Sequence, residues 1–210
     1  MTTLLTPISI LLLAFSAASA ADTSEPSPNA PDYLRAIRAN DLSALKKLCR
    51  AGCGSIHDGL DWTPLHYAAL YGNTESVRIA QDGGGDANAR NSAQATPLIL
   101  AAYSLEKTRL LVEKGGNVNA KTSAGFTPLW VALSTVENED TVRFLIAKGA
   151  DLKHVAPNGQ DYLMRAASLQ PAEIVRLLLD KGLDPHKDDG SGFNALANTF
   201  DRDAAPNRGY

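Results

Sequence analysis

A seven-residue motif that begins with Thr-Pro-Leu constrains this chain more than any other feature, because it returns at a nearly fixed distance. Clear copies begin at Thr63, Thr96 and Thr127, and degenerate copies begin at Asp161 and Asn194. The steps between these five starting residues are 33, 31, 34 and 33 residues. A period of this length is typical of proteins that stack one small structural unit on the next, so we expect a single elongated domain.

Each copy also carries a signal for the start of a helix. A Thr hydroxyl at an N-cap accepts a hydrogen bond from the first turn, and a Pro at the next position has no N–H to leave unpaired. Asp161 and Asn194 are residue types that cap helices well, so the signal persists where Thr-Pro is lost. Small residues follow, which allow neighbouring units to approach closely: Ala68, Ala69, Ala101, Ala102, Ala166 and Ala167.

The first clear copy reads Thr-Pro-Leu-His-Tyr-Ala-Ala from Thr63 to Ala69. At this period the motif resembles the ankyrin repeat, whose unit is a β-turn followed by two helices. The resemblance implies an all-α solenoid of helix-turn-helix repeats with β-turn fingers over residues 32–200, with about five repeats and a C-terminal half repeat. It also implies that His66 makes a structural hydrogen bond back to the turn before its helix.

The remaining pattern of the repeats predicts caps, a core and one weak point. Residues 33–49 predict an N-terminal capping repeat without Thr-Pro, and the last copy, from residue 193, ends before a second helix can form. Three consecutive glycines, Gly83 to Gly85, follow a poor second helix, so we expect the softest part of the stack there. Left-handed C-terminal caps are expected at Gly84, Gly115, Gly149 and Gly182. The predicted core consists of Leu65, Ala69, Leu98, Leu110, Leu111, Leu129, Leu145, Leu163, Ile174, Val175 and Leu178.

The two ends of the chain differ from the repeats. Residues 1–20 contain an apolar run, no charged side chain and a final Ala18-Ser19-Ala20, which predicts a signal peptide cleaved before Ala21. The apolar run is shorter than the roughly 20 residues of a membrane span, which disfavours an uncleaved anchor. Residues 21–31 predict a flexible linker and residues 201–210 a disordered tail. Export predicts a bacterial periplasmic location, without membrane insertion of the mature chain.

Composition excludes some functions. The formal net charge is -3, and no cluster of Lys and Arg is interleaved with aromatic residues, so we expect no nucleic-acid binding. No nucleophile elbow, phosphate-binding glycine loop or recognisable carboxylate pair is present, so we predict no enzymatic activity and no cofactor. His154 and His186 fall in the fingers, where we expect surface side chains.

The only cysteines are Cys49 and Cys53, and their spacing leaves several interpretations open. In an oxidising compartment, residues four apart near a helix end can form a disulfide, which is the interpretation that export favours. In a reducing compartment the cysteines would be an apolar helix-end residue and a bystander. A metal site with His57 is disfavoured, because structural zinc sites usually have shorter Cys spacing and a second ligand pair.

The resemblance also implies which positions face the concave groove, and the residues there form an apolar and aromatic strip with one Arg. Aromatic clusters with Arg are where binding energy concentrates at protein interfaces. The predicted partner-binding residues are Trp62, Tyr67, Leu70, Leu100, Tyr103, Phe126, Val131 and Arg165.

The sequence therefore predicts a non-enzymatic protein-protein interaction module in the cell envelope, a monomer on its own, which binds another protein in its groove. Two roles remain open: an adaptor or chaperone-like helper, and an immunity-type antagonist of a toxin or hydrolase. The alternative is a metal-binding or redox stress protein that uses Cys49, Cys53 and His57.

Overall fold

The computed structural model describes residues 31–50, 52–192 and 194–196, and over these residues the chain forms ten helices and no extended strand. The predicted signal peptide, nearly all of the linker, the tail and most of the predicted half repeat lie outside this part. The helices are α2 (Asp32–Arg38), α3 (Leu42–Cys49), α4 (Pro64–Tyr71), α5 (Thr74–Asp82), α6 (Pro97–Ala101), α7 (Leu105–Glu113), α8 (Pro128–Leu133), α9 (Glu139–Ala147), α10 (Tyr162–Leu169) and α11 (Ala172–Asp180).

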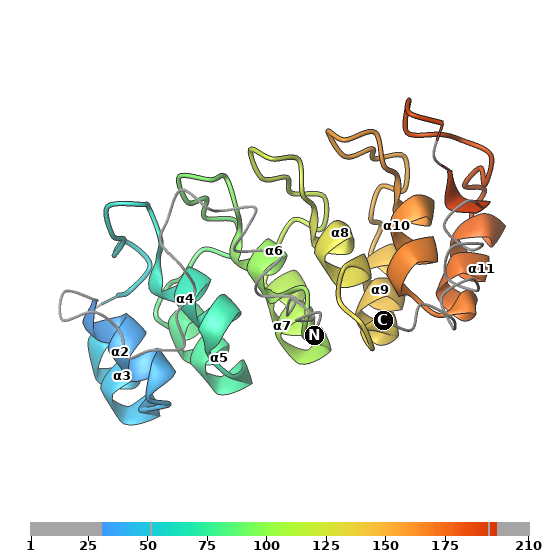
Figure 1. Ribbon diagram of the computed structural model, residues 1–210. Helices are drawn as coiled ribbons and strands as arrows, with labels where there is room; N and C mark the ends of the chain where they lie inside the picture. Colours follow the sequence, from blue (N-terminus) through green and yellow to red (C-terminus); the bar gives the residue numbers. More distant parts are fainter. Residues whose placement is uncertain (1–30, 51, 193, 197–210) are drawn as a thin grey trace, which may run out of the picture.

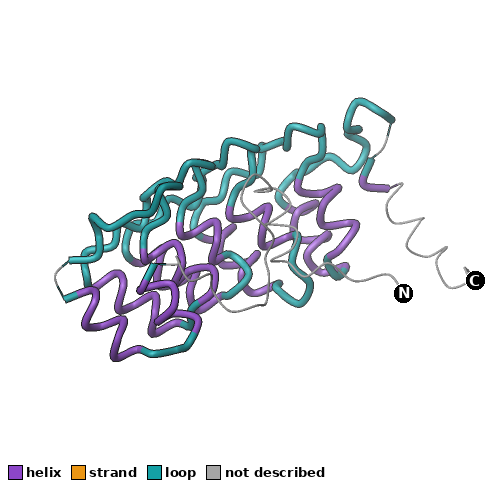
Figure 2. The backbone as a smooth tube through the Cα atoms, turned by 60° about the vertical axis from the view of Figure 1, so that its left-hand side comes forward, coloured by secondary structure: helices purple, strands orange, loops and turns teal. Residues whose placement is uncertain are grey.

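The helices form five pairs that follow one another along a stack, from the blue α2 and α3 to the orange α11 (Figure 1). Helices α2, α4, α6, α8 and α10 pack on one another in one row, and α3, α5, α7 and α9 pack in a second row. We call the first row the inner helices and the second row, with α11, the outer helices. The loops between pairs, here called the fingers, project to one side of the helices (Figures 1 and 2). This architecture confirms the predicted all-α solenoid.

The predicted caps explain where the inner helices begin. The side chains of Thr63, Thr96, Thr127 and Asp161 each accept a hydrogen bond from the backbone N–H three residues later. A Pro follows each of the three threonines at the first helical position. The helix expected after Asn194 lies outside the described residues.

The four predicted glycine caps are also confirmed. Gly84, Gly115, Gly149 and Gly182 have φ angles of 90°, 84°, 86° and 87°. Residues with a Cβ rarely adopt this left-handed conformation, so glycine ends each of these repeats at low conformational cost.

The core runs between neighbouring pairs, and alanine and leucine dominate it. The six motif alanines are at most 1% exposed, which allows the inner helices to approach closely. Nine of the eleven predicted core residues are fully buried. Leu110 and Val175 are only partly buried and pack against the edge of the core, because they lie on the outer helices beside solvent.

A buried lysine joins the second and third repeats, and the sequence analysis did not identify it. Lys107 of α7 is 4% exposed. Its Nζ donates to the carbonyl oxygens of Ala69, at 2.7 Å, and Gly72, at 3.0 Å, and also to the hydroxyl of Tyr103. The last carbonyls of a helix have no partner within the helix, and a cation is favourable there. Lys107 therefore caps the end of α4 from the following repeat.

Two buried amides play the same part at the next junctions. Asn138 Nδ2 donates to the carbonyl oxygen of Ala102 at 2.9 Å, just after α6. Gln170 Nε2 donates to the carbonyl oxygens of Leu133 and Thr135 at 2.9 Å each, at the end of α8. Each of these inner helices is thus completed by a polar side chain that reaches back from the next repeat.

Candidate protein-interaction surface

Three of the eight predicted partner-binding residues belong to the core. Leu70, Leu100 and Val131 are 2%, 0% and 6% exposed. The inner helices lie so close together that these side chains fill the space between neighbouring repeats instead of facing outward. The prediction that a partner contacts these three side chains is therefore wrong.

The other five predicted residues are partly buried and keep some accessible surface: Trp62, Tyr67, Tyr103, Phe126 and Arg165. Tyr67 and Arg165 lie on inner helices, Trp62 and Phe126 at the last position of a finger before a helix cap, and Tyr103 in the turn between α6 and α7. Their contact with a partner stays a prediction, and the structure shows what holds each of them in place.

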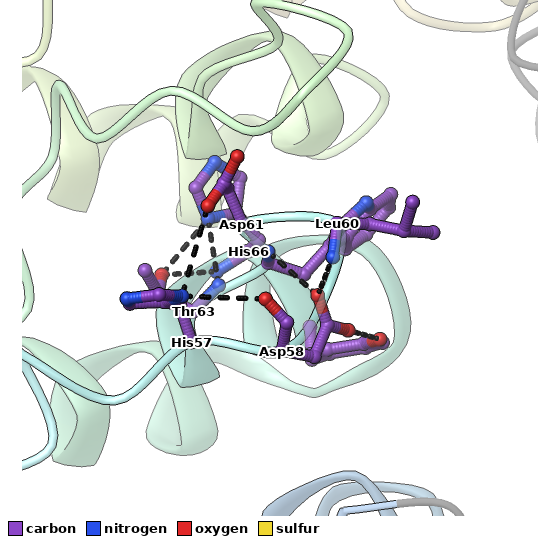
Figure 3. A network of polar contacts seen from close by, with 8 residues as sticks. His57, Asp58, Leu60, Asp61, Thr63 and His66 are labelled. Carbon is purple, nitrogen blue, oxygen red and sulfur yellow. Dashed lines mark hydrogen bonds and ion pairs between the residues drawn. The ribbon is translucent and has the colours of Figure 1, made fainter.

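Asp58, in the first finger, fixes two of these aromatic residues. Its Oδ2 accepts a hydrogen bond from the Tyr67 hydroxyl at 2.6 Å. Its Oδ1 accepts from the backbone N–H groups of Leu60, at 2.8 Å, and Trp62, at 3.0 Å. Figure 3 shows this carboxylate at the centre of the polar contacts around the finger. Asp58 was missed by the sequence analysis, although Asp followed by Gly59 is a turn signal that points to such backbone contacts.

Tyr67 lies beside three other aromatic rings. We call the four residues together the N-terminal aromatic cluster: Tyr33, Trp62, Tyr67 and Tyr71. The ring centroid of Tyr67 is 5.6 Å from that of Tyr33, 5.0 Å from Trp62 and 6.3 Å from Tyr71. The guanidinium carbon of Arg38 lies 4.6 Å from the Tyr71 centroid. Ring pairs at these separations stabilise one another, and a cation over the ring adds to this.

Tyr33, Tyr71 and Arg38 were also missed by the sequence analysis, although their positions carried a signal. Tyr71 follows Tyr67 by one helical turn, and Tyr33 precedes it by about one repeat. Burial raises the pKa of Tyr33 to about 12, with a smaller contribution from Asp58. Burial and the bond to the Asp58 carboxylate raise the pKa of Tyr67 further. Both phenols therefore stay protonated at neutral pH, and that of Tyr67 donates to Asp58.

Tyr103 has a structural role that the sequence analysis did not expect. Its hydroxyl donates to the carbonyl oxygen of Leu70 at the end of α4, and Lys107 Nζ lies 4.3 Å from its ring centroid. Burial raises the pKa of Tyr103 to about 12. An aromatic residue at this position is therefore explained by packing between repeats, without a partner.

Arg165, on α10, marks the other end of the inner face. Its Nε donates to the Ser134 hydroxyl at 2.9 Å, and its guanidinium carbon lies 5.6 Å from the centroid of the buried Trp130 ring. Trp130 also lies 6.2 Å from the rings of Phe126 and Tyr162. Phe126 thus packs against a ring of the helix that follows it, α8.

The predicted role of His66 is confirmed. Its Nδ1 accepts from the backbone N–H of Thr63 at 3.2 Å, so its Nε2 carries the proton and donates to the carbonyl oxygen of Ala95 at 3.0 Å. Burial lowers the pKa of His66, which keeps the ring neutral. The expectation of a surface position for His154 is wrong: it is 8% exposed, because its ring packs 5.7 Å from that of Tyr162. His186 is exposed as expected.

Cys49 and Cys53 are buried neighbours. The Cys53 thiol donates to the carbonyl oxygen of Ala80 at 3.5 Å, and its proximity together with burial raises the pKa of Cys49. A Cβ placed on Gly83 would lie 2.7 Å from Cys53 Sγ and 2.9 Å from Cys49 Cβ, so glycine makes room for the pair. The two sulfurs are not bonded to each other, and the disulfide stays a prediction that alkylation of the denatured, unreduced protein would test.

His57 does not join the two cysteines. It is exposed, and its Nδ1 lies 3.7 Å from a carboxylate oxygen of Asp61 (Figure 3). Within the described residues, no group of three or more His, Cys, Asp or Glu side chains could hold a metal ion. The metal-binding alternative therefore has two thiols and no third ligand in this part of the chain.

None of the described helices is long and apolar enough to cross a membrane.

Comparison with known proteins agrees with the geometry. The family model described as ankyrin repeats in three copies matches the chain three times, over residues 34–122, 83–156 and 104–189. No curated protein matches the chain. The matches cover most of the sequence and coincide with the five helix pairs, so the chain belongs to the ankyrin repeat family.

Proposed function

We propose that this protein is a non-enzymatic interaction module of the cell envelope, which binds a partner protein on the face formed by its inner helices and fingers. Ankyrin repeats generally mediate protein-protein interaction, and the family alone names no partner. The observation that carries the proposal is the N-terminal aromatic cluster, in which Tyr33 is buried while Trp62, Tyr67 and Tyr71 are partly exposed and held in place before any partner arrives.

Preorganisation is what makes this cluster suited to binding. Asp58 fixes the hydroxyl of Tyr67 and the backbone of Trp62, so little side-chain freedom remains to be lost on association. Tyr and Trp are the residue types most enriched where binding energy concentrates, and Arg38 beside Tyr71 adds a third such type. A solvated helix face without a partner would carry Lys or Glu at these positions.

The envelope location rests on the apolar, uncharged residues 1–20 with their small residues before Ala21. An intact mass that begins at Ala21 in the envelope fraction would support export, whereas a mass that retains Met1 would exclude cleavage. Within the envelope, an adaptor or an antagonist of a toxin or hydrolase fits a module of this kind. A stoichiometric complex with an envelope protein supports the adaptor, and inhibition of a co-purified enzyme or toxin supports the antagonist.

The binding face is tested by replacing Tyr67 and Tyr71 together with Ala. Each truncation is expected to cost about 2 kcal/mol of binding free energy, or some thirtyfold in affinity. Phe144→Ala, on the outer helix α9, is the matched control for the opposite face. If the double variant folds by circular dichroism and retains its partner with unchanged affinity, the aromatic cluster is not the binding site.

A further inference from the structure

Arg165 is a partly buried cation without a carboxylate partner among the described residues. Ion pairs with carboxylates join Arg35 to Asp32, Arg78 and Lys46 to Glu75, and Lys187 to Asp161. The buried Lys107 is satisfied by two carbonyl oxygens and a hydroxyl. Arg165 is partly buried, yet over the described ranges its only hydrogen-bond acceptor is the neutral hydroxyl of Ser134.

A charge in this position costs free energy unless an opposite charge reaches it. Charged side chains are rarely buried without a partner, because the protein interior solvates them poorly. Burial lowers the pKa of Arg165, but a guanidinium remains charged at neutral pH. The buried Trp130 ring lies 5.6 Å from the guanidinium carbon and Ser134 accepts from Nε, so the two terminal nitrogens are the donors left for an anion.

The acidic residue nearest to Arg165 in the sequence is Asp161, which caps α10 by accepting from the Met164 N–H and lies 4.0 Å from Lys187 Nζ; no ion pair joins it to Arg165 among the described residues. Over α2, α4, α6, α8 and α10, Asp32 at the far end is the only carboxylate, whereas Arg35, Arg38 and Arg165 are cationic. The chain as a whole has a formal charge of -3, so its acidic residues lie elsewhere, on the outer helices and fingers. The helical part of the inner face is therefore complementary to an acidic group.

We propose that Arg165 binds a carboxylate of the partner, and that the partner presents an acidic protein segment whose apolar residues reach the N-terminal aromatic cluster. With Nε bonded to Ser134, the two terminal nitrogens of the guanidinium can grip both oxygens of an Asp or Glu side chain. This inference rests on the proposed function, since it names the chemistry of the partner at the same face.

The test is a selection of random peptides displayed on phage against the full chain and its Arg165→Gln variant. Peptides selected on the unmodified chain should be enriched in Asp or Glu toward one end and in aromatic or aliphatic residues toward the other, because Arg165 and the aromatic cluster lie at opposite ends of the inner face. On Arg165→Gln the acidic preference should vanish, while the apolar preference remains. Arg176→Gln, on the exposed side of α11, is the matched control and should select the same acidic peptides as the unmodified chain.

A selected peptide and its Glu→Gln counterpart then give the magnitude. On the unmodified chain the amide peptide should bind about tenfold more weakly or worse, as expected for the loss of a charge-assisted bidentate pair. On Arg165→Gln the two peptides should bind alike. Arg165→Lys, which retains the charge and loses the fork, should preserve part of the difference and also guards against a variant that fails to fold.

Several outcomes would overturn the inference. Selected peptides without an acidic preference, or an acidic preference that remains on Arg165→Gln, would show that Arg165 does not bind the partner's carboxylate. The proposed binding at the aromatic cluster would be unaffected by either result. A gain in peptide affinity on replacing Asp201 and Asp203 by Asn would identify the chain's own carboxylates as the occupants. If no peptide is selected on any version of the chain, both this inference and the proposed function fail.

Discussion

The first junction of the stack and the three junctions that follow it are held together by opposite means. Between the first and second repeats, backbones approach closely: Gly83 makes room for Cys49 and Cys53, and a Cβ on Gly54 would lie 2.0 Å from the Gly84 carbonyl oxygen. At the next three junctions, buried polar side chains cross from one repeat to the preceding one. The same repeat geometry thus depends at the first junction on glycines, which have no side chain, and at the later junctions on buried polar side chains.

This comparison predicts that the later junctions fail when atoms are removed. Lys107→Ala leaves the carbonyl oxygen of Gly72 without this partner and that of Ala69 with the longer bond from the Tyr103 hydroxyl at 3.3 Å, and an unsatisfied buried acceptor costs about 1–3 kcal/mol. We expect a loss of about 3 kcal/mol in the free energy of unfolding, measured by urea denaturation. Lys114→Ala, at an exposed position, should change it by less than about 0.5 kcal/mol. Equal effects of the two variants would contradict the capping role.

The first junction should instead fail when an atom is added. Gly83→Ala forces a methyl group against Cys53 Sγ and Cys49 Cβ, and overpacking of this kind costs about 1–3 kcal/mol. Gly59→Ala is the control, since its Cβ meets nothing within 4 Å. A Gly83→Ala variant as stable as the unmodified protein would show that the cysteine pair moves aside, and the predicted softness of this region would gain support.

The buried lysine also gives the later junctions a dependence on pH. Burial lowers the pKa of Lys107 to about 8, from an ordinary value of 10.5 in the unfolded chain. Between these values the unfolded chain holds one more proton than the folded chain, so stability rises with pH, by up to about 1.4 kcal/mol per unit. Urea denaturation from pH 8 to 9.5 should show this rise, and Lys107→Met should abolish it. A slope that persists in the variant would assign the effect to other groups.

The smallest effect is expected at an exposed contact of the first junction. Asn73 caps α5 through Ser76 N–H, and its Nδ2 donates to Asn40 Oδ1 at 2.7 Å. Asn73→Ala should cost about 1 kcal/mol, mostly from loss of the cap. Asn40→Ala removes the bond to Asn73 and leaves the cap intact. It also adds a backbone cost, because Asn40 has a φ of 53°, which Ala tolerates less well. Asn73→Asp retains the cap and should recover most of the stability.

Local chemistry explains which features were predictable. Thr63, Thr96, Thr127 and Asp161 act on the backbone three residues away, so the sequence was sufficient to predict them as helix starts. The glycine caps and the bond from His66 to its own turn are equally local.

The features that sequence analysis missed depend on the distance between repeats. Lys107, Asn138 and Gln170 look like ordinary polar residues of a helix start, and only the position of the preceding repeat makes them buried caps. The burial of Leu70 and Leu100 has the same origin, because close approach at the alanines turns an apparent surface position inward. Asp58 acts through a finger whose shape no periodic pattern describes.

Because each buried polar side chain contacts the repeat before it, the order in which the repeats are synthesised determines when each inner helix is capped. A chain that leaves the ribosome or a translocation channel N-terminus first delivers α4 before Lys107, α6 before Asn138 and α8 before Gln170. Until the next repeat emerges, the last carbonyls of each inner helix have only water as a partner. The second, third and fourth repeats are therefore each completed by the repeat that follows, and a chain that stops within this region ends on an incomplete unit.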